Sequence, residues 1–121
     1  MQEINNFEEN VKRMEQQNSH NIELYNKVVE ALKRIYDPEI PVNIWELGLV
    51  YDIKITAANE VVVLMTLTAP NCPEAGSIPQ NADYYIRNLN GVTGTKVILT
   101  FDPPWEPNRM SEVAKLELGM F

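Results

Sequence analysis

Residues 49–68 carry the clearest alternation of hydrophobic and polar positions in the chain. In LVYDIKIT, at 49–56, apolar residues at 49, 51, 53 and 55 alternate with polar ones at 52, 54 and 56, so the two sets point to opposite faces, as is typical of a half-buried β-strand. In VVVLMTLT, at 61–68, both faces are apolar, which predicts a central strand. The short AANE segment between them predicts a turn in which Asn59 accepts a positive φ, so the two strands should form a hairpin.

Helical periodicity predicts three helices. The first begins near Asn21 and should stop before Pro38, because the residue before a proline resists the helical conformation. The second follows the central strand and has Pro79 in its first turn, where the missing N–H costs nothing. The third is a short helix at 109–118, with Gly119 as its C-terminal cap. The apolar stripes expected to face the core are Tyr25, Val28, Leu32 and Ile35 (with Val29 and Tyr36 beside them) on the first helix, and Ile78, Ala82, Tyr85, Ile86 and Leu89 on the second.

A third strand, TKVILTF at 95–101, completes the order α-β-β-α-β-α. One face of this strand carries Val97, Leu99 and Phe101. The order predicts an α+β protein, a two-layer α/β sandwich in which a small three-stranded mixed sheet is covered on one face by helices. Residues 21–121 should form this domain, and residues 1–20 should form a polar N-terminal arm or short helix.

Composition and charge narrow the classes of function. The chain of 121 residues is 45% hydrophobic, so an ordered globule is expected. Its net charge of −7 repels phosphate backbones, which argues against nucleic acid as a partner. No apolar run approaches the roughly 20 residues that a membrane span needs. The single cysteine cannot form an internal disulfide, and the start MQEINNFEENVKR lacks a secretory core, so a soluble, cytoplasmic protein is expected.

Residue content argues against several kinds of catalytic or metal site. His20 is the only histidine and lies in the polar arm, so a Cys–His or Ser–His–Asp arrangement would require that arm to fold over the sheet. CxxC, HExxH, GxGxxG and Walker motifs are absent from the sequence. A closed zinc site needs about four Cys or His ligands, and this chain has one Cys and one His. We therefore expect no self-contained metal centre, and a thiol enzyme, the remaining catalytic alternative, would lack a base near its thiol other than His20.

The sole cysteine lies in the proline-flanked segment LTAPNCPEAGSIPQ, between the central strand and the second helix. A thiol such as Cys72 near a helix N-terminus is stabilised as the thiolate, the form that binds metal or attacks electrophiles. Pro70 and Pro73 would stiffen the loop, and Thr66 and Thr68 could supply hydroxyls to the same pocket. Free cysteines are also often buried and inert, and the spacing alone leaves both interpretations open.

Two acidic loops that contain proline are further candidates. In DPEIP, Asp37 and Glu39 could cap turns, which the local pattern favours, or could face Cys72 as metal ligands or partner contacts. In DPPWEP, Asp102 precedes two prolines, and Trp105 is either a lid over the core, the favoured interpretation, or an exposed anchor. The residues predicted to contact a partner protein are Trp45, Asp102, Trp105 and Arg109.

Three segments in combination carry a family resemblance: ALKRIYDPEIPVNIWELGLVYDIKI, VVLMTLTAPNCPEAG and VILTFDPPWEPNRMSEVAKLELG. They resemble the SufT-like family of iron–sulfur cluster assembly factors, whose FSCA-type domain also occurs in MIP-type cytosolic assembly proteins and in PaaD. The family's Asp-Pro-Glu acids fall on Asp37 and Glu39. Its Thr-Thr-Pro-Gly-Cys-Pro run falls on residues 68–73, with Ala69 in place of the second threonine and Asn71 in place of the glycine.

The resemblance implies a compact two-layer α/β fold and a role as an accessory factor, not an enzyme, in the maturation of iron–sulfur proteins. It implies partners among iron–sulfur scaffold or carrier proteins and client apoproteins, and a homodimer stays an open alternative. Cys72 would then be a transient ligand for iron or an iron–sulfur cluster, or a contact with the scaffold or client during transfer, supported by Asp37, Glu39, Thr66 and Thr68. No cluster is expected to be stably bound, because clusters usually take four cysteine ligands. The alternative is an adaptor that links scaffold or carrier proteins to clients without binding metal.

Overall fold

The computed structural model describes residues 22–69 and 77–119. The predicted N-terminal arm and Cys72 lie outside these residues. Within them, a first helix at residues 22–32 is followed by β1, β2, α2, β3, a short 3₁₀ helix (η1) and α3. This is the predicted α-β-β-α-β-α order, with η1 as an addition.

The sheet has three strands in the order β1-β2-β3. β1 (Val50–Ile55) pairs antiparallel with β2 (Glu60–Met65), and β3 (Gly94–Leu99) pairs parallel with β2. The sheet is therefore mixed, and the strand with apolar residues on both faces is central, as predicted. Asn59 has a φ of 64° between β1 and β2, which confirms the predicted hairpin turn.

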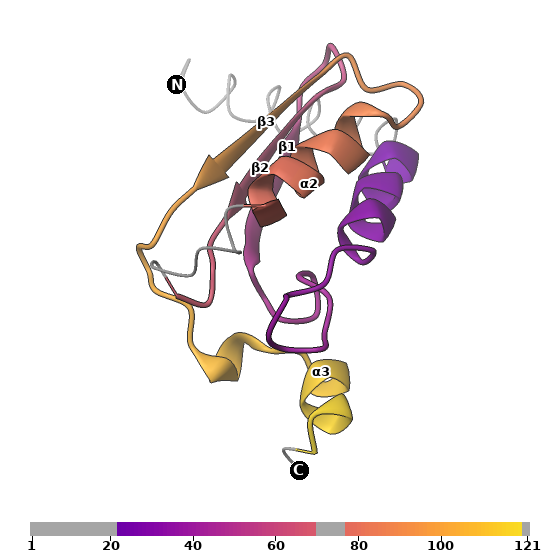
Figure 1. The fold of residues 1–121 in the computed structure, drawn as a ribbon. Helices are drawn as coiled ribbons and strands as arrows, with labels where there is room; N and C mark the ends of the chain where they lie inside the picture. Colours follow the sequence, from indigo (N-terminus) through magenta and orange to yellow (C-terminus); the bar gives the residue numbers. More distant parts are fainter. Residues whose placement is uncertain (1–21, 70–76, 120–121) are drawn as a thin grey trace, which may run out of the picture.

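The helices cover one face of this sheet (Figure 1). α2 (Ser77–Arg87) lies over the strands, and the first helix lies next to α2 on the same side. A core forms between the two layers because each layer contributes one apolar face. The core residues with no exposed surface include Val28, Leu32, Leu49, Val61, Val63, Ala82 and Ile86.

The first helix buries a slightly different stripe from the predicted one. Tyr25 is 40% exposed, so its predicted place on the core-facing stripe is wrong, and the same holds for Tyr85 on α2, which is also 40% exposed. The helix ends at residue 32 and not just before Pro38, so Tyr36, predicted beside the stripe, lies beyond the helix and is 59% exposed. A tyrosine can cover apolar surface with part of its ring while its hydroxyl stays in water, whereas small and aliphatic residues fill the space beneath it. The buried residues on and just after this helix are Leu24, Val28, Ala31, Leu32 and Ile35.

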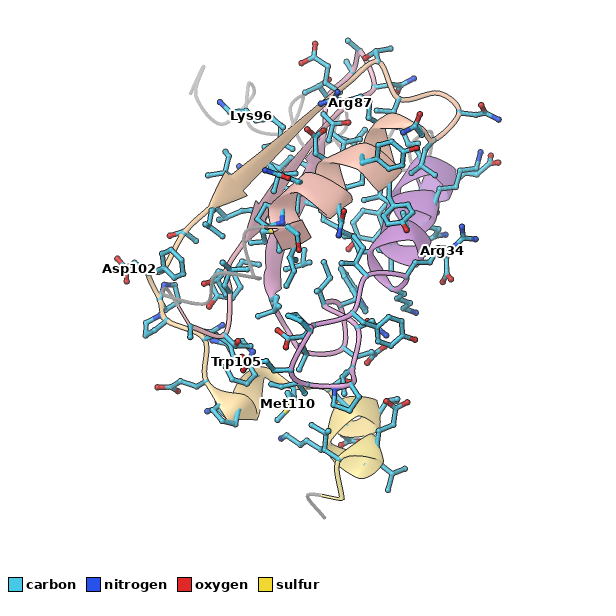
Figure 2. The ribbon with its side chains drawn as sticks, viewed as in Figure 1. Arg34, Arg87, Lys96, Asp102, Trp105 and Met110 are labelled. Atoms are coloured by element: carbon cyan, nitrogen blue, oxygen red, sulfur yellow. The ribbon has the colours of Figure 1, made fainter. Side chains whose placement is uncertain are left out.

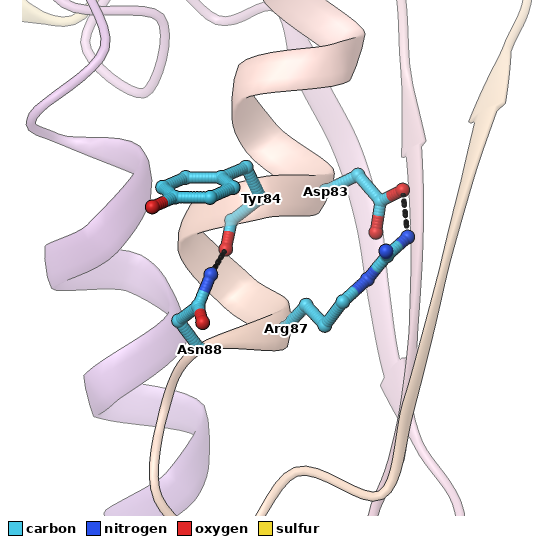
Figure 3. A network of polar contacts seen from close by, with 4 residues as sticks. All are labelled: Asp83, Tyr84, Arg87 and Asn88. Atoms are coloured by element: carbon cyan, nitrogen blue, oxygen red, sulfur yellow. Dashed lines mark hydrogen bonds and ion pairs between the residues drawn. The ribbon is translucent and has the colours of Figure 1, made fainter.

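The outer face of α2 is polar and linked along the helix (Figure 3). Arg87 Nη2 lies 2.6 Å from Asp83 Oδ2, one turn earlier, and Asn88 Nδ2 donates to the Tyr84 carbonyl over 2.7 Å. An exposed pair at this spacing contributes about 0.3–0.5 kcal/mol, so packing of the apolar face decides the position of the helix. Gly91, with a φ of 96°, then turns the chain toward β3.

The C-terminal helix begins later than predicted. In place of one helix at 109–118, the chain forms η1 (Pro107–Arg109) and α3 (Glu112–Glu117). Ser111 separates them, because its backbone is extended and its Oγ accepts a hydrogen bond from Ala114 N over 3.1 Å, as an N-cap does. Gly119 has a φ of 69°, as expected for the predicted C-terminal cap.

β3 is less buried than its apolar sequence suggests. Val97 is half-buried, but Leu99 and Phe101, predicted on the same face, are 42% and 40% exposed. Among the described strands, β3 is at the edge of the sheet, so its outer side has no neighbouring strand.

Candidate functional site

Three segments of the chain meet at one end of the sheet. Met65, the last residue of β2, pairs with Val50 at the start of β1 and with Leu99 at the end of β3. The segment before β1 and the segments after β2 and β3 therefore all reach the sheet at this end. Every predicted site residue within the described ranges belongs to one of these segments: Asp37, Glu39 and Trp45; Thr66 and Thr68; Asp102, Trp105 and Arg109.

Asp37 organises the loop before β1. Its side chain is 8% exposed, and Oδ1 accepts hydrogen bonds from Glu39 N over 2.8 Å and from Ile40 N over 2.9 Å. Its own N–H donates to the Val42 carbonyl over 3.2 Å. This is the capping role favoured by the sequence pattern, and Glu39, two residues further on, is exposed.

We expect Asp37→Ala to lower the free energy of unfolding by about 1.5 kcal/mol, because two loop amides lose their acceptor. Asp37→Asn is the matched control, since it retains an oxygen that can accept the same bonds, and it should cost less than half as much. Urea denaturation followed by tryptophan fluorescence measures both. Equal losses in the two variants would show that the negative charge matters more than the two hydrogen bonds.

Trp105 fastens the segment after β3 to the loop before β1. Its half-buried ring packs against the core, and Nε1 donates to the Leu47 carbonyl over 2.7 Å. Close by, Ser111 N donates to the Glu46 carbonyl over 2.8 Å, and the Ser111 hydroxyl donates to the Glu46 carboxylate. The interpretation of Trp105 as a lid is therefore confirmed. Figure 2 shows Trp105 near this junction and Asp102 on the outer side of the molecule.

Trp45 resembles Trp105 in its burial. It is half-buried and packs against the same core. Both tryptophans therefore have a structural role, whereas Asp102 and Arg109 are exposed. A role in partner contact stays a prediction for all four residues.

An open hollow of about 560 Å³ lies at this end of the sheet. Tyr51 crosses it, with its hydroxyl donating to the Pro103 carbonyl over 2.8 Å. The guanidinium carbon of Arg109 lies 4.8 Å from the centroid of the Tyr51 ring, which is a cation–π contact. The structure thus brings Asp102 and Arg109 into one cavity. Its lining residues are Gly48, Val50, Tyr51, Leu64, Asp102, Pro103 and Arg109.

Thr66 and Thr68 precede the segment that holds Cys72. Thr66 has no exposed surface and its N–H donates to the Leu49 carbonyl over 2.8 Å. Its Oγ1 is buried and has no hydrogen-bond partner among the described residues, whereas Thr68 is half-exposed. The predicted thiol chemistry of Cys72 lies outside the described residues and stays a prediction.

Within residues 22–69 and 77–119, no three His, Cys, Asp or Glu side chains gather into a group that could hold a metal ion. Across the same two ranges, no helix combines the length and apolarity required to cross a bilayer.

Of the residues that line the hollow, the sequence predicted only Asp102 and Arg109 as site residues, and Tyr51 and Gly48 show why the others were missed. The alternation in LVYDIKIT places Tyr51 with the core-facing residues, but the pairing register shifts between Val50 and Asp52. Such a bulge changes the direction of one side chain, and nothing in the sequence signals it. Gly48 has a φ of 79°, and a Cβ added to it would lie 2.3 Å from the Arg109 carbonyl oxygen. The glycine at the end of this loop was visible in the sequence, but its distant contact was not.

Comparison with known proteins identifies the family. Residues 26–99 match the family model described as iron-sulfur cluster assembly protein. The chain belongs to this family. The SufT-like resemblance is confirmed as well: the chain is 33% identical over 86 residues to the Fe-S protein maturation auxiliary factor SufT of Staphylococcus aureus, covering 71% of this chain and 98% of that protein.

Two further proteins are similar to this chain over most of their length. A Fe-S protein maturation auxiliary factor of Porphyromonas gingivalis is 49% identical over 92 residues, covering 76% of this chain and 88% of the relative. A crystal structure of a domain of unknown function from Bacillus anthracis superposes with a TM-score of 0.74 at 38% identity, covering 79% of this chain and 92% of the other. The predicted α+β fold is confirmed.

Proposed function

We propose that this protein is an accessory factor in the maturation of iron–sulfur proteins, and that it assists the assembly or delivery of clusters without being an enzyme. The family match over residues 26–99 supports this most directly. Two relatives that align with this chain over most of their own length are named Fe-S protein maturation auxiliary factor. The partners are then scaffold or carrier proteins of the iron–sulfur pathway and client apoproteins. The single cysteine fits a reducing, cytoplasmic setting.

Within this role we assign transient contact with the cargo to Cys72. A single thiolate cannot satisfy a cluster that usually takes four cysteine ligands, so the remaining ligands would come from the donor or the acceptor protein. An incomplete site suits transfer, because a cluster held by one ligand leaves easily. The described part of the chain supplies no group of acids or histidines that would retain the metal instead.

The neighbours of Cys72 along the chain support this assignment in one respect. Thr66 has a buried hydroxyl without a partner among the described residues, which is an unusual cost for a folded protein. It directly follows Met65, the last residue of β2, where the chain leaves the sheet for the segment that holds the thiol. Thr66 and Thr68 are therefore proposed as supporting residues, and Asp37 and Glu39 as the acids of the adjacent loop.

Replacing Cys72 tests the assignment. We expect anaerobic reconstitution with ferrous iron and sulfide to give cluster-like visible absorption with the wild type and at least fivefold less with Cys72→Ser, because the oxygen of serine is a poor ligand for this metal. Maturation of an iron–sulfur enzyme in cells that lack their own factor should fall in parallel. Gln80→Ala is the control, since it changes an exposed polar residue of α2 close to the same segment and leaves the thiol. Equal uptake of iron and sulfide by wild type and Cys72→Ser would rule out direct ligation.

A second candidate is an adaptor that joins carrier and client proteins without touching metal. The observation in its favour is the exposed hollow that contains Asp102 and Arg109, because the described residues that line it include no group that could hold a metal ion. Full maturation activity of Cys72→Ser together with loss of activity in Arg109→Gln would favour the adaptor. The opposite pattern would favour ligation by Cys72.

A further inference from the structure

The hollow at the end of the sheet contains a cation in a fixed position. The Arg109 guanidinium lies against the Tyr51 ring, 4.8 Å from carbon to centroid, and the Tyr51 hydroxyl is fixed by the Pro103 carbonyl at 2.8 Å. The Arg109 backbone is also held, because its N–H donates to the Glu106 carbonyl over 2.9 Å and its carbonyl packs directly on Gly48. A guanidinium held at both ends loses little freedom when it binds a ligand.

The donors of this cation are not used within the described part of the chain. The ion pairs there involve Lys27, Lys33 and Arg87, and none involves Arg109. Stacking on an aromatic ring occupies the face of a guanidinium and leaves its in-plane N–H groups available. Arg109 therefore presents a planar fork of donors that matches a carboxylate in two parallel hydrogen bonds.

The rest of the hollow restricts what can reach this fork. Val50, Leu64 and Pro103 line it with apolar surface, which would accept an aliphatic side chain next to the charged group. Asp102 also lines the hollow and forms no ion pair with Arg109. The negative charge of Asp102 and the net charge of −7 on the chain repel a bound anion. This repulsion disfavours a phosphate dianion more than a ligand carboxylate, which carries a single charge.

We propose that this hollow binds a partner protein through a glutamate or aspartate side chain that pairs with Arg109, flanked in the partner by an aliphatic residue that lies on Val50 and Leu64. The inference rests on the proposed function only in taking the partner to be a protein of the iron–sulfur pathway. Asp102 at the rim accepts hydrogen bonds from N–H groups of the partner's segment and repels a second acidic side chain. The site therefore selects a segment that is acidic at one position and apolar beside it over a uniformly acidic segment.

A titration with short peptides tests the site directly. The probe is an acetylated and amidated pentapeptide, Ala-Leu-Glu-Leu-Ala, added to the ¹⁵N-labelled full chain, and amide shifts are followed by NMR. We expect shifts at Gly48, Tyr51 and Arg109, and association at least about tenfold weaker for the peptide with Gln in place of Glu. Binding should also weaken as sodium chloride is added, because the contact is ionic.

Protein variants locate the interaction. Arg109→Gln should weaken association by about tenfold, and Arg109→Lys by less, because lysine retains the charge and loses the planar fork. Arg34→Gln is the matched control: this arginine is exposed, has no ion pair among the described residues, and lies on the opposite side of the molecule from Asp102 (Figure 2). Equal affinity for the Glu and Gln peptides, equal loss in Arg34→Gln, or shifts confined to the first helix would each overturn the proposal. Circular dichroism establishes whether each variant is folded. If Arg109→Gln does not fold, the difference in affinity between the Glu and Gln peptides for the wild type still decides the question.

Cellular maturation assays separate this proposal from the proposed function. If Cys72→Ser loses maturation of an iron–sulfur enzyme and Arg109→Gln retains it, the hollow is not the partner site and the proposed function stands. If the wild type does not restore maturation at all, the proposed function fails, and the peptide titration still decides whether the hollow binds a carboxylate. Loss of maturation in Arg109→Gln, with Arg34→Gln fully active, supports the proposal.

Discussion

Gly48→Ala is expected to lower the free energy of unfolding by about 4 kcal/mol. Two costs combine at this position. The residue has a φ of 79°, where an L side chain is strained, and the new Cβ would meet the Arg109 carbonyl oxygen at 2.3 Å and its carbonyl carbon at 2.9 Å. Both neighbours are backbone atoms, so no side chain can rotate to relieve the overlap, and the loop before β1 must separate from η1.

Gly91→Ala is the matched control for this prediction. Gly91 also has a positive φ, 96°, but nothing lies within 4 Å of its added Cβ. It should therefore cost only the conformational strain, about 1.5 kcal/mol. Urea denaturation of both variants measures the difference. Similar losses would contradict a close contact between Gly48 and Arg109, and would remove part of the support for the fixed guanidinium.

Ile86→Ala should have the second largest effect, a loss of about 3.5 kcal/mol. Ile86 has no exposed surface and lies on the face of α2 that covers the sheet. Removing three buried carbon atoms loses their transfer energy and leaves a cavity that the rigid sheet cannot close.

Ile98→Ala provides the control with the same chemical change. Ile98 belongs to β3 and is 39% exposed, so we expect a loss below about 1 kcal/mol. Denaturation followed by circular dichroism gives both values in the same conditions. If Ile98→Ala were as costly as Ile86→Ala, the exposed surface around the Ile98 side chain would have to be covered in the folded protein.

The local patterns were sufficient where neighbouring residues decide the structure. The alternation at 49–56, the doubly apolar run at 61–68 and the periodic stripe that contains Ile86 all form the predicted elements. The third helix begins later than the apolar spacing predicts because the side chain of Ser111 caps its N-terminus. Tyr25 was misplaced because a partly exposed tyrosine fits the same spacing as a buried residue.

The candidate site was predictable only in part. Asp37 caps a turn two and three residues away, so a short-range pattern indicated its role. Trp105 bonds to Leu47, 58 positions earlier, and Tyr51 bonds to Pro103, 52 positions later. Contacts over such separations depend on how the loops meet at the end of the sheet, which no local pattern encodes.

The sequence by itself determined the family, the order of strands and helices, the acidic character and the presence of one thiol. The family follows from long matching segments of the sequence, and the order of elements follows from spacings of two to four positions, the range over which backbone periodicity acts. Only the tertiary structure decided that Arg109 lies over Tyr51 and that Gly48 must lack a side chain. It also decided that Asp102 lines the same hollow as these three residues. The reason is that a bulge in β1 and the pairing of Met65 with both edge strands bring these distant loops together.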